Sequence, residues 1–153
     1  MQPSTPAISN KFVTEFRIQD VDHAPWLPAN AKPLLEKILG QSAIWTGWVD
    51  GKVVAVCGIT LVHPHYGHCW TYLHPDALTH RYWLHRRTKR ILHNYVRASE
   101  LWRVDAVCLA SHVEASVWLD RLGLKRESGP MPFYGPQGET MVRHVWFPRG
   151  ING

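Results

Sequence analysis

The sequence has no apolar run near the roughly 20 residues that a membrane-spanning helix needs. Its first ten residues, MQPSTPAISN, carry neither the basic start nor the apolar stretch of a secretory signal. Charged residues make up only 19% of the chain, but hydrophobic residues make up 45%, which excludes a disordered polymer. A chain of 153 residues can bury a core without a disulfide or metal staple. We therefore expect one soluble, unexported domain with a cytoplasmic location.

Cysteine is scarce, with only Cys57, Cys69 and Cys108, and no Cys-x-x-Cys motif occurs. A chain without an export signal keeps its thiols reduced. Cys57 and Cys69 fall on neighbouring predicted strands, where we expect packed thiols rather than a disulfide.

Three histidines, His63, His65 and His68, crowd one predicted turn, with Cys69 and His74 close by in sequence. Histidines at alternating positions can hold zinc. The proline and glycine of the same turn account for the spacing equally well. We expect no metal.

Acidic residues are missing from one long segment. Between Ala77 and Ser99 there are six Lys/Arg and no acid, whereas eleven bases face twelve acids in the rest of the chain. The net charge of +5 therefore belongs to this segment. Apolar residues recur along it at helical spacing, which predicts a helix from about His80 to Ala98 with bases on its other faces. The six bases are Arg81, Arg86, Arg87, Lys89, Arg90 and Arg97.

The remaining pattern predicts the fold. Alternating apolar and polar residues predict strands over 12–18, 43–49, 52–62, 69–74, 103–110, 124–127 and 141–147. Asp50-Gly51 between two of them predicts a tight hairpin, and helical patterns cover 31–39, 80–98 and 111–122. The order predicts a single α/β (α+β) domain over 11–149, after a flexible tail at 1–10. Its sheet should be mixed and mostly antiparallel, with helices on both faces.

One helix and the strand after it carry the most specific motif. Residues 114–127 read EASVWLDRLGLKRE, which resembles the Asn-x-x-Ala…Tyr-x-x-Leu-Gly-Phe element of the GNAT superfamily of N-acetyltransferases. Leu73-His-Pro75 is similar to the strand end Val-x-Pro that precedes the family's phosphate loop. The size and the Trp/His-rich texture also resemble those of small GNAT-like proteins of tailed bacteriophages, which would place the chain in the host cytoplasm or the virion.

The resemblance implies acetyl transfer from acetyl-CoA to an amine, on a protein substrate. It implies that two splayed strands hold the pantetheine like an extra strand, with phosphates at the start of the basic helix. His74 is expected as the catalytic base at the strand end, and Tyr134 as a second group able to move protons. The residues expected to bind the cofactor are Tyr72, Leu73, His74, Arg81, Tyr82, Trp83, Arg86 and His112.

The family's catalytic signature is incomplete in this sequence. No glycine lies between Tyr72 and Asp120, so Arg81 and Arg86 would have to replace the glycine-rich phosphate loop. The tyrosine of the Tyr-x-x-Leu-Gly-Phe element is Leu119, which cannot donate a proton. An alternative therefore stays open: a GNAT-like protein without catalysis that binds a host or virion protein, or nucleic acid, through the helix Arg81–Arg97.

Overall fold

The computed structural model describes residues 9–151. The strands are β1 (Lys11–Glu15), β2 (Ser42–Val49), β3 (Lys52–His63), β4 (Tyr66–Leu73), β5 (Arg103–Leu109), β6 (Lys125–Arg126) and β7 (Met141–Trp146). The α-helices are α1 (Ala31–Ile38), α2 (Arg81–Ala98) and α3 (Val113–Leu122), and the 3₁₀ helices are η1 (Ile18–His23), η2 (Leu39–Gln41) and η3 (Pro75–His80). Of the predicted tail at 1–10, residues 1–8 lie outside the described residues, and Asn10 already hydrogen-bonds to Asp50. No helix among residues 9–151 is long and apolar enough to cross a membrane.

Within residues 9–151, seven strands form one sheet in the order β1-β2-β3-β4-β5-β7-β6, in which only the β4–β5 pairing is parallel. This confirms the predicted α/β domain with a mostly antiparallel sheet. The Asp50-Gly51 hairpin is also confirmed, since both residues adopt the positive φ, 50° and 80°, that a tight two-residue turn requires.

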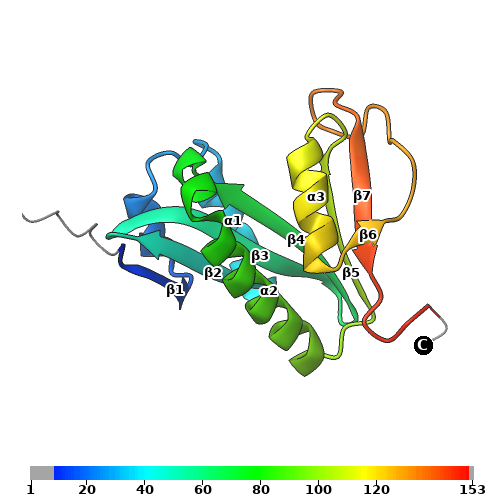
Figure 1. Ribbon diagram of the computed structural model, residues 1–153, viewed down its shortest axis with the longest axis horizontal. Coiled ribbons are helices and arrows are strands. Elements are labelled where there is room, and N and C mark those ends of the chain that lie inside the picture. The colour runs from blue at the N-terminus through cyan, green and yellow to red at the C-terminus, as the bar shows by residue number, and fades with distance from the viewer. Residues whose placement is uncertain (1–8, 152–153) are drawn as a thin grey trace, which may run out of the picture.

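Helices cover both faces of the sheet (Figure 1). On one face, Leu92 and Val96 of α2 and Leu122 of α3 pack with Ile59 and Val104 into one buried cluster. Side chains alternate along a strand, so the neighbours of these residues face the other side. There, a second cluster joins α1 and the η1 region to β2 and β3 through Phe16, Ala24, Leu35, Ile44, Val53 and Val56.

β4 starts at Tyr66, three residues before the strand predicted over 69–74, and two further segments differ from the sequence prediction. The first strand ends at Glu15 instead of residue 18, because Asp20 Oδ2 accepts the backbone N–H of Arg17 at 3.0 Å and starts η1. Pro75–His80, expected as the approach to a helix, is itself the helix η3. Both are local turns that hydrophobic periodicity does not register.

Candidate functional site

The strands β4 and β5 pair with each other over only three positions, Tyr66 with Arg103, Gly67 with Val104 and His68 with Asp105. Beyond these, β4 continues along β3 to Leu73, and β5 continues along β7 to Leu109. The two strands therefore diverge, as Figure 1 shows. We call the unpaired segments, residues 69–73 of β4 and 106–109 of β5, the β4–β5 fork. The last paired rung, His68 with Asp105, is its base.

Alternation of the backbone shows which groups face the fork. His74 donates its N–H to the carbonyl of Val54 at 2.9 Å. The backbone N–H and C=O groups of every second residue before it on β4 therefore also point toward β3. The N–H and C=O groups of Cys69, Thr71 and Leu73 then face the fork. By the same alternation from Ala110, which donates to Thr140 at 3.0 Å, both backbone groups of Val107 and the N–H of Leu109 face it from β5, while the Leu109 carbonyl accepts the N–H of His112. Both arms of the fork thus carry unpaired strand backbone.

This alternation separates the three β4 residues of the expected cofactor set by the direction of their backbone groups. Of Tyr72, Leu73 and His74, only Leu73 directs its backbone toward the fork. The His74 side chain is also engaged, because its Nδ1 accepts the N–H of Asp76 at 3.0 Å and its ring packs against Trp26. His74 lies at the open end of the fork, roughly 20 Å from His68 by strand rise. It is therefore remote from the base of the fork, where the strands meet.

A buried carboxylate occupies the base of the fork. Asp105 is 0% exposed and accepts hydrogen bonds from His68 Nδ1 at 2.7 Å, from the Tyr66 hydroxyl and from Arg143 Nη1 at 3.2 Å. Burial on its own would raise the pKa of Asp105. The hydrogen bonds from His68 and Tyr66 and the charge of Arg143 outweigh it, so the pKa lies below its ordinary value. The carboxylate is therefore ionised at neutral pH.

An ionised carboxylate can only accept hydrogen bonds, so His68 Nδ1 carries the proton of this contact. The other ring nitrogen, Nε2, is then the basic one, and it has no hydrogen-bond partner among the described residues. The His68 side chain is 34% exposed. Because Val104 and Ala106 pack on the face covered by α2 and α3, the pair lies on the opposite face of the sheet. This is the arrangement of a histidine base oriented by a buried acid.

Tyr134 is connected to the same carboxylate. Arg143 Nη2 donates to the Tyr134 hydroxyl at 2.7 Å, while Nη1 of the same guanidinium contacts Asp105. Tyr134 lies on the loop between β6 and β7, which Met131 and Met141 close through two backbone hydrogen bonds of 2.7 and 3.1 Å. One arginine thus joins the predicted tyrosine to the base of the fork.

At the open end of the fork, η3 stands where the resemblance places a phosphate loop. The N–H of Asp76 goes to His74, and the N–H of Arg81 goes to the carbonyl of Leu78, so these groups are used within the turn. The Arg81 guanidinium is exposed beside the Tyr82 ring, 5.1 Å from its centroid, and its hydrogen bond and charge lower the pKa of Tyr82. An anion here would meet side chains rather than backbone.

The other expected cofactor residues lie outside the fork, on α2 and at the start of α3. Arg86 is exposed on α2, and His112 is exposed at the start of α3, where its N–H bonds to the carbonyl of Leu109 at 3.0 Å. Trp83 instead packs against a buried cluster that includes Leu84 and residues of β2 and β3. The structure therefore places Arg81, Tyr82 and Arg86 on α2, which follows β4 through η3, places His112 after β5, and turns Trp83 toward the core.

Side-chain hydrogen bonds connect α2 with α3 on the face of the sheet that these two helices cover. The Trp118 indole N–H donates to His85 Nδ1 at 3.1 Å, and His93 Nε2 contacts the carbonyl of Leu122 at 2.8 Å. Burial lowers the pKa of His85, and the charges of Lys89 and Arg121 lower it further. Arg121 thus adds a positive charge from α3 close to the bases of α2.

The histidines of the predicted turn separate in the structure. His63 Nδ1 accepts the N–H of His65 at 3.2 Å, the His65 ring stacks on Trp102 at 3.7 Å, and His68 contacts Asp105. Within residues 9–151, no group of three or more His, Cys, Asp or Glu side chains is placed to hold a metal ion.

All three cysteines are free, as predicted, and Cys57 Sγ lies 3.0 Å from the Thr71 hydroxyl. Burial raises the pKa of Cys57 to about 11 and also raises that of Cys69, to which the charge of Asp105 contributes. These thiols are poor nucleophiles at neutral pH.

Sequence reasoning missed the role of His68 and did not single out Asp105 or Arg143. A signal was present, because Asp105 is an acid in the middle of the apolar strand pattern RVDAVCL. A carboxylate at such a position needs partners on the same face of the sheet. The identity of those partners follows only from the β4–β5 register, which joins residues 37 positions apart.

A mostly antiparallel sheet with one parallel pair that diverges, flanked by helices on both faces, defines the GNAT fold. Solved structures of that fold match the chain. A spermidine N-acetyltransferase (SpeG) from Vibrio cholerae matches with a TM-score of 0.71 at 8% identity, over 90% of this chain and 95% of the other. An acetyltransferase of the GNAT family from Streptococcus pneumoniae matches with a TM-score of 0.64 at 12% identity, over 90% and 99%.

A third match is the ribosomal L7/L12 alpha-N-protein acetyltransferase RimL in complex with coenzyme A, with a TM-score of 0.60 at 12% identity, over 75% of this chain and 66% of that one. No protein-family model and no curated protein sequence matches the chain. The chain therefore has the fold of the GNAT N-acetyltransferases, and the likeness is one of fold.

Proposed function

We propose that this protein transfers an acyl group from acyl-CoA to an amine. The observation that carries the proposal is the β4–β5 fork with His68 and Asp105 at its base. Unpaired strand backbone on both arms suits an extended molecule with amide groups, and a basic imidazole stands where the strands meet. The coenzyme A complex of the RimL neighbour supports the choice of ligand.

In this proposal the fork backbone binds the pantetheine arm. Thr71 and Leu73 on β4, and Val107 on β5, offer N–H and C=O groups with the geometry of strand pairing. Thr71, Leu73 and Leu109 are exposed, so a ligand can reach this backbone. The phosphates then lie at the open end of the fork, beside Arg81 and Arg86, with side chains in place of a glycine-rich loop.

His68 takes the proton from the amine. The amine nitrogen attacks the thioester carbonyl, the N–C bond forms, the C–S bond breaks, and the thiolate of CoA leaves. Asp105 holds the Nδ1 proton in place and stabilises the positive charge that His68 gains. Leu119 offers no proton to the thiolate, and its side chain packs against the core cluster, so protonation falls to water. Asp105 is thus a positioning residue and His68 the catalytic one.

We propose an amine on a protein as the acceptor. The loop between β6 and β7 supports this, because it extends from the same side of the site and carries an exposed aromatic pair, Phe133 and Tyr134. Phe133 is 84% exposed and has a positive φ of 58°, a conformation that a bulky residue adopts at a cost. An exposed phenylalanine held in this way suits contact with a peptide.

The test is release of CoA thiol from acetyl-CoA in the presence of primary amines, with spermidine and peptides of varied N-terminus as acceptors. We expect acceptor-dependent thiol release that His68→Asn abolishes and His74→Asn retains. Equal turnover by the wild type and His68→Asn would contradict the assignment of the base. Acceptor-independent release would contradict transfer.

A second candidate function rests on the exposed side of α2. Arg86, Lys89, Arg90 and Arg97 are exposed there, and none of them has a carboxylate within salt-bridge distance among residues 9–151. We propose, as the alternative, that the chain has no catalytic activity and binds a nucleic acid, or an acidic host or virion protein, through this surface, in line with its resemblance to small GNAT-like phage proteins. Two results would support it: binding to duplex DNA that weakens steeply as salt is added, and weaker binding by the double variant Arg86→Ala/Arg90→Ala than by the wild type. Salt-independent or absent binding would oppose it.

A further inference from the structure

We propose that two copies of this chain pair through β1, edge to edge, in an antiparallel arrangement with its two-fold axis at Val13. This inference is independent of acyl transfer, and it concerns the outer edge of the sheet, remote from the fork in strand order.

The first observation is an open strand edge. Among residues 9–151, β1 is the end strand of the sheet, and its backbone pairs only with β2. Phe16 donates to the carbonyl of Ile44 at 2.9 Å, so by alternation Phe12 and Thr14 direct their backbone groups toward β2. The N–H and C=O groups of Lys11, Val13 and Glu15 therefore face outward. Such an edge is a ready template for another strand.

The second observation is the symmetry of the outward groups. In an antiparallel pair centred on Val13, each Val13 faces its counterpart, and Lys11 of one copy faces Glu15 of the other. All six outward groups of each strand then pair, because residues 11, 13 and 15 are hydrogen-bonding positions on both strands. A two-fold axis makes each strand both template and partner, which closes the assembly at two copies.

The third observation is charge. Lys11 and Glu15 lie on the same face of β1, both are exposed, and neither forms a salt bridge within residues 9–151. The two-fold register places each Lys11 opposite a Glu15, so two complementary pairs form at once. A parallel arrangement, or a slip by two residues, would lose these pairs. The charges therefore select this register.

The opposite edge of the sheet is built differently. β6 has only two residues, Lys125 and Arg126, both of them basic. A short, like-charged edge strand opposes pairing with a second copy. β1 has five residues, no proline and charges of both signs. The two edges thus differ in the features that permit or prevent association.

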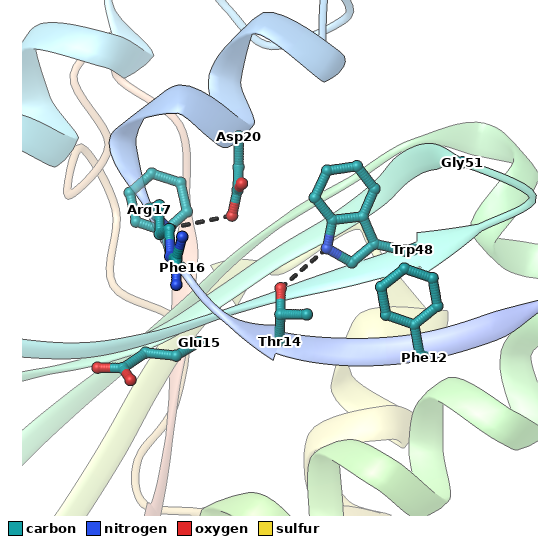
Figure 2. Close-up of a pocket in the computed structure, with 8 residues that line it drawn as sticks. All are labelled: Phe12, Thr14, Glu15, Phe16, Arg17, Asp20, Trp48 and Gly51. Carbon is teal, nitrogen blue, oxygen red and sulfur yellow. Dashed lines mark hydrogen bonds between the residues drawn. The ribbon is translucent and has the colours of Figure 1, made fainter.

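Hollows flank β1 on both faces of the sheet. One, of about 600 Å³, is lined on one face by Phe12, Thr14 and Trp48. In Figure 2 the rings of Phe12 and Trp48 lie beside each other and the Trp48 indole N–H points to Thr14, whereas Glu15 points away from them. The other hollow, of about 640 Å³, lies toward α2 and includes Val13 in its lining.

Across the proposed axis, Phe12 of one copy faces Thr14 of the other at a non-hydrogen-bonded position, where side chains approach most closely. The two Phe12 rings lie diagonally to one another, within reach of aromatic contact. Phe12 is stacked on Trp48 with a centroid distance of 5.9 Å, so the partner's ring would extend an aromatic layer that already exists. Apolar surface of the exposed Phe12 would thereby be covered.

The test measures the association of the full chain by sedimentation velocity over a concentration series. We expect a dimer for the wild type. Lys11→Glu and Glu15→Lys each place like charges opposite one another twice, so each should weaken the dimer about tenfold or more. The double variant Lys11→Glu/Glu15→Lys restores opposite charges in the same register and should return the dissociation constant to within about threefold of the wild type.

Val13→Pro provides a backbone test. It removes an N–H that points outward and leaves the N–H groups bonded to β2 in place, so the monomer should fold and fail to dimerise. A wild type that stays monomeric up to roughly 1 mM would overturn the proposal. A dimer indifferent to both single charge reversals, with no recovery to measure in the double variant, would also overturn it. The charge variants decide the matter even where Val13→Pro does not fold.

Discussion

His68 Nδ1 lies 2.7 Å from Asp105 Oδ1, across the last rung at which β4 and β5 pair. The contact places the proton of neutral His68 on Nδ1 and leaves Nε2 as the ring nitrogen that can accept a proton. It also marks the point at which the two strands begin to diverge. The orientation of the His68 ring and the point at which the fork opens are thus set by the same pair of residues.

Replacement of His68 tests its role in the reaction. We expect His68→Asn to lower kcat by about 10²–10⁴-fold, the contribution typical of a general base. CoA binding should be unchanged, because the fork backbone remains. His74→Asn is the matched control, since His74 lies at the open end of the same strand and caps η3. A similar loss of kcat in both variants would argue against a specific role for His68.

Asp105 should matter for stability as well as for orientation. Asp105→Asn leaves Arg143 without its buried carboxylate and should lower the free energy of unfolding by about 3 kcal/mol. Asp120→Asn, which breaks the exposed pair with Lys125, should change it by less than about 1 kcal/mol. Urea unfolding of both variants measures the difference. Equal effects would contradict the buried network.

The lowered pKa of Asp105 also predicts how the free energy of unfolding changes with pH in acid. A carboxyl whose pKa is lower in the folded state contributes stability that is fully present above its unfolded pKa of about 3.9. That contribution is lost as the pH falls through the folded-state value. The unfolding free energy of the wild type should therefore drop below about pH 4, and that of Asp105→Asn should drop less.

His144 predicts a second pH dependence, at milder acidity. It is 2% exposed, its Nε2 contacts the Ser116 hydroxyl at 2.8 Å, and its Nδ1 is a buried atom without a partner among the described residues. Burial, aided by the charge of Arg126, lowers its pKa. The neutral ring therefore contributes stability that is fully present above its unfolded pKa of about 6.5 and is lost as the pH falls from there through the lower folded-state pKa.

His144→Gln keeps a hydrogen-bonding group toward Ser116 and removes the titration. Unfolding free energies measured from pH 7.5 to 5 should fall less steeply for this variant than for the wild type. A residual slope of the same sign should remain from His85, whose pKa burial also lowers. Identical slopes in the two proteins would refute the role of His144.

The partly buried thiols, whose pKa values are raised, predict slow reaction with thiol reagents in the folded protein. Burial raises the pKa values of Cys57, Cys69 and Cys108, that of Cys57 to about 11. A thiol reagent such as DTNB at pH 7.5 should react slowly with the native chain and quickly with all three thiols in urea. Fast reaction of one native thiol would show that its surroundings differ from those described.

Local sequence patterns predicted most of the fold, but they predicted less of the candidate site. The Asp50-Gly51 turn and the helical spacing along α2 depend on neighbours in sequence, so periodicity and turn chemistry suffice for both. The pairing of His68 with Asp105 depends on where β5 returns beside β4, which no local pattern specifies. The prediction that the His74 backbone binds the cofactor did not include backbone alternation. Alternation turns the His74 N–H toward Val54 and away from the fork.

The central claim is that the backbone of the β4–β5 fork binds CoA. Thr71→Pro removes an N–H that faces the fork, and Thr71→Ala removes only the side chain. The most direct measurement is isothermal titration of CoA into the wild type and these two variants. We predict binding by the wild type and Thr71→Ala, with affinity reduced at least about tenfold in Thr71→Pro, as the loss of a buried hydrogen bond requires. Equal affinity in all three proteins, or no binding by the wild type at millimolar CoA, would contradict the account.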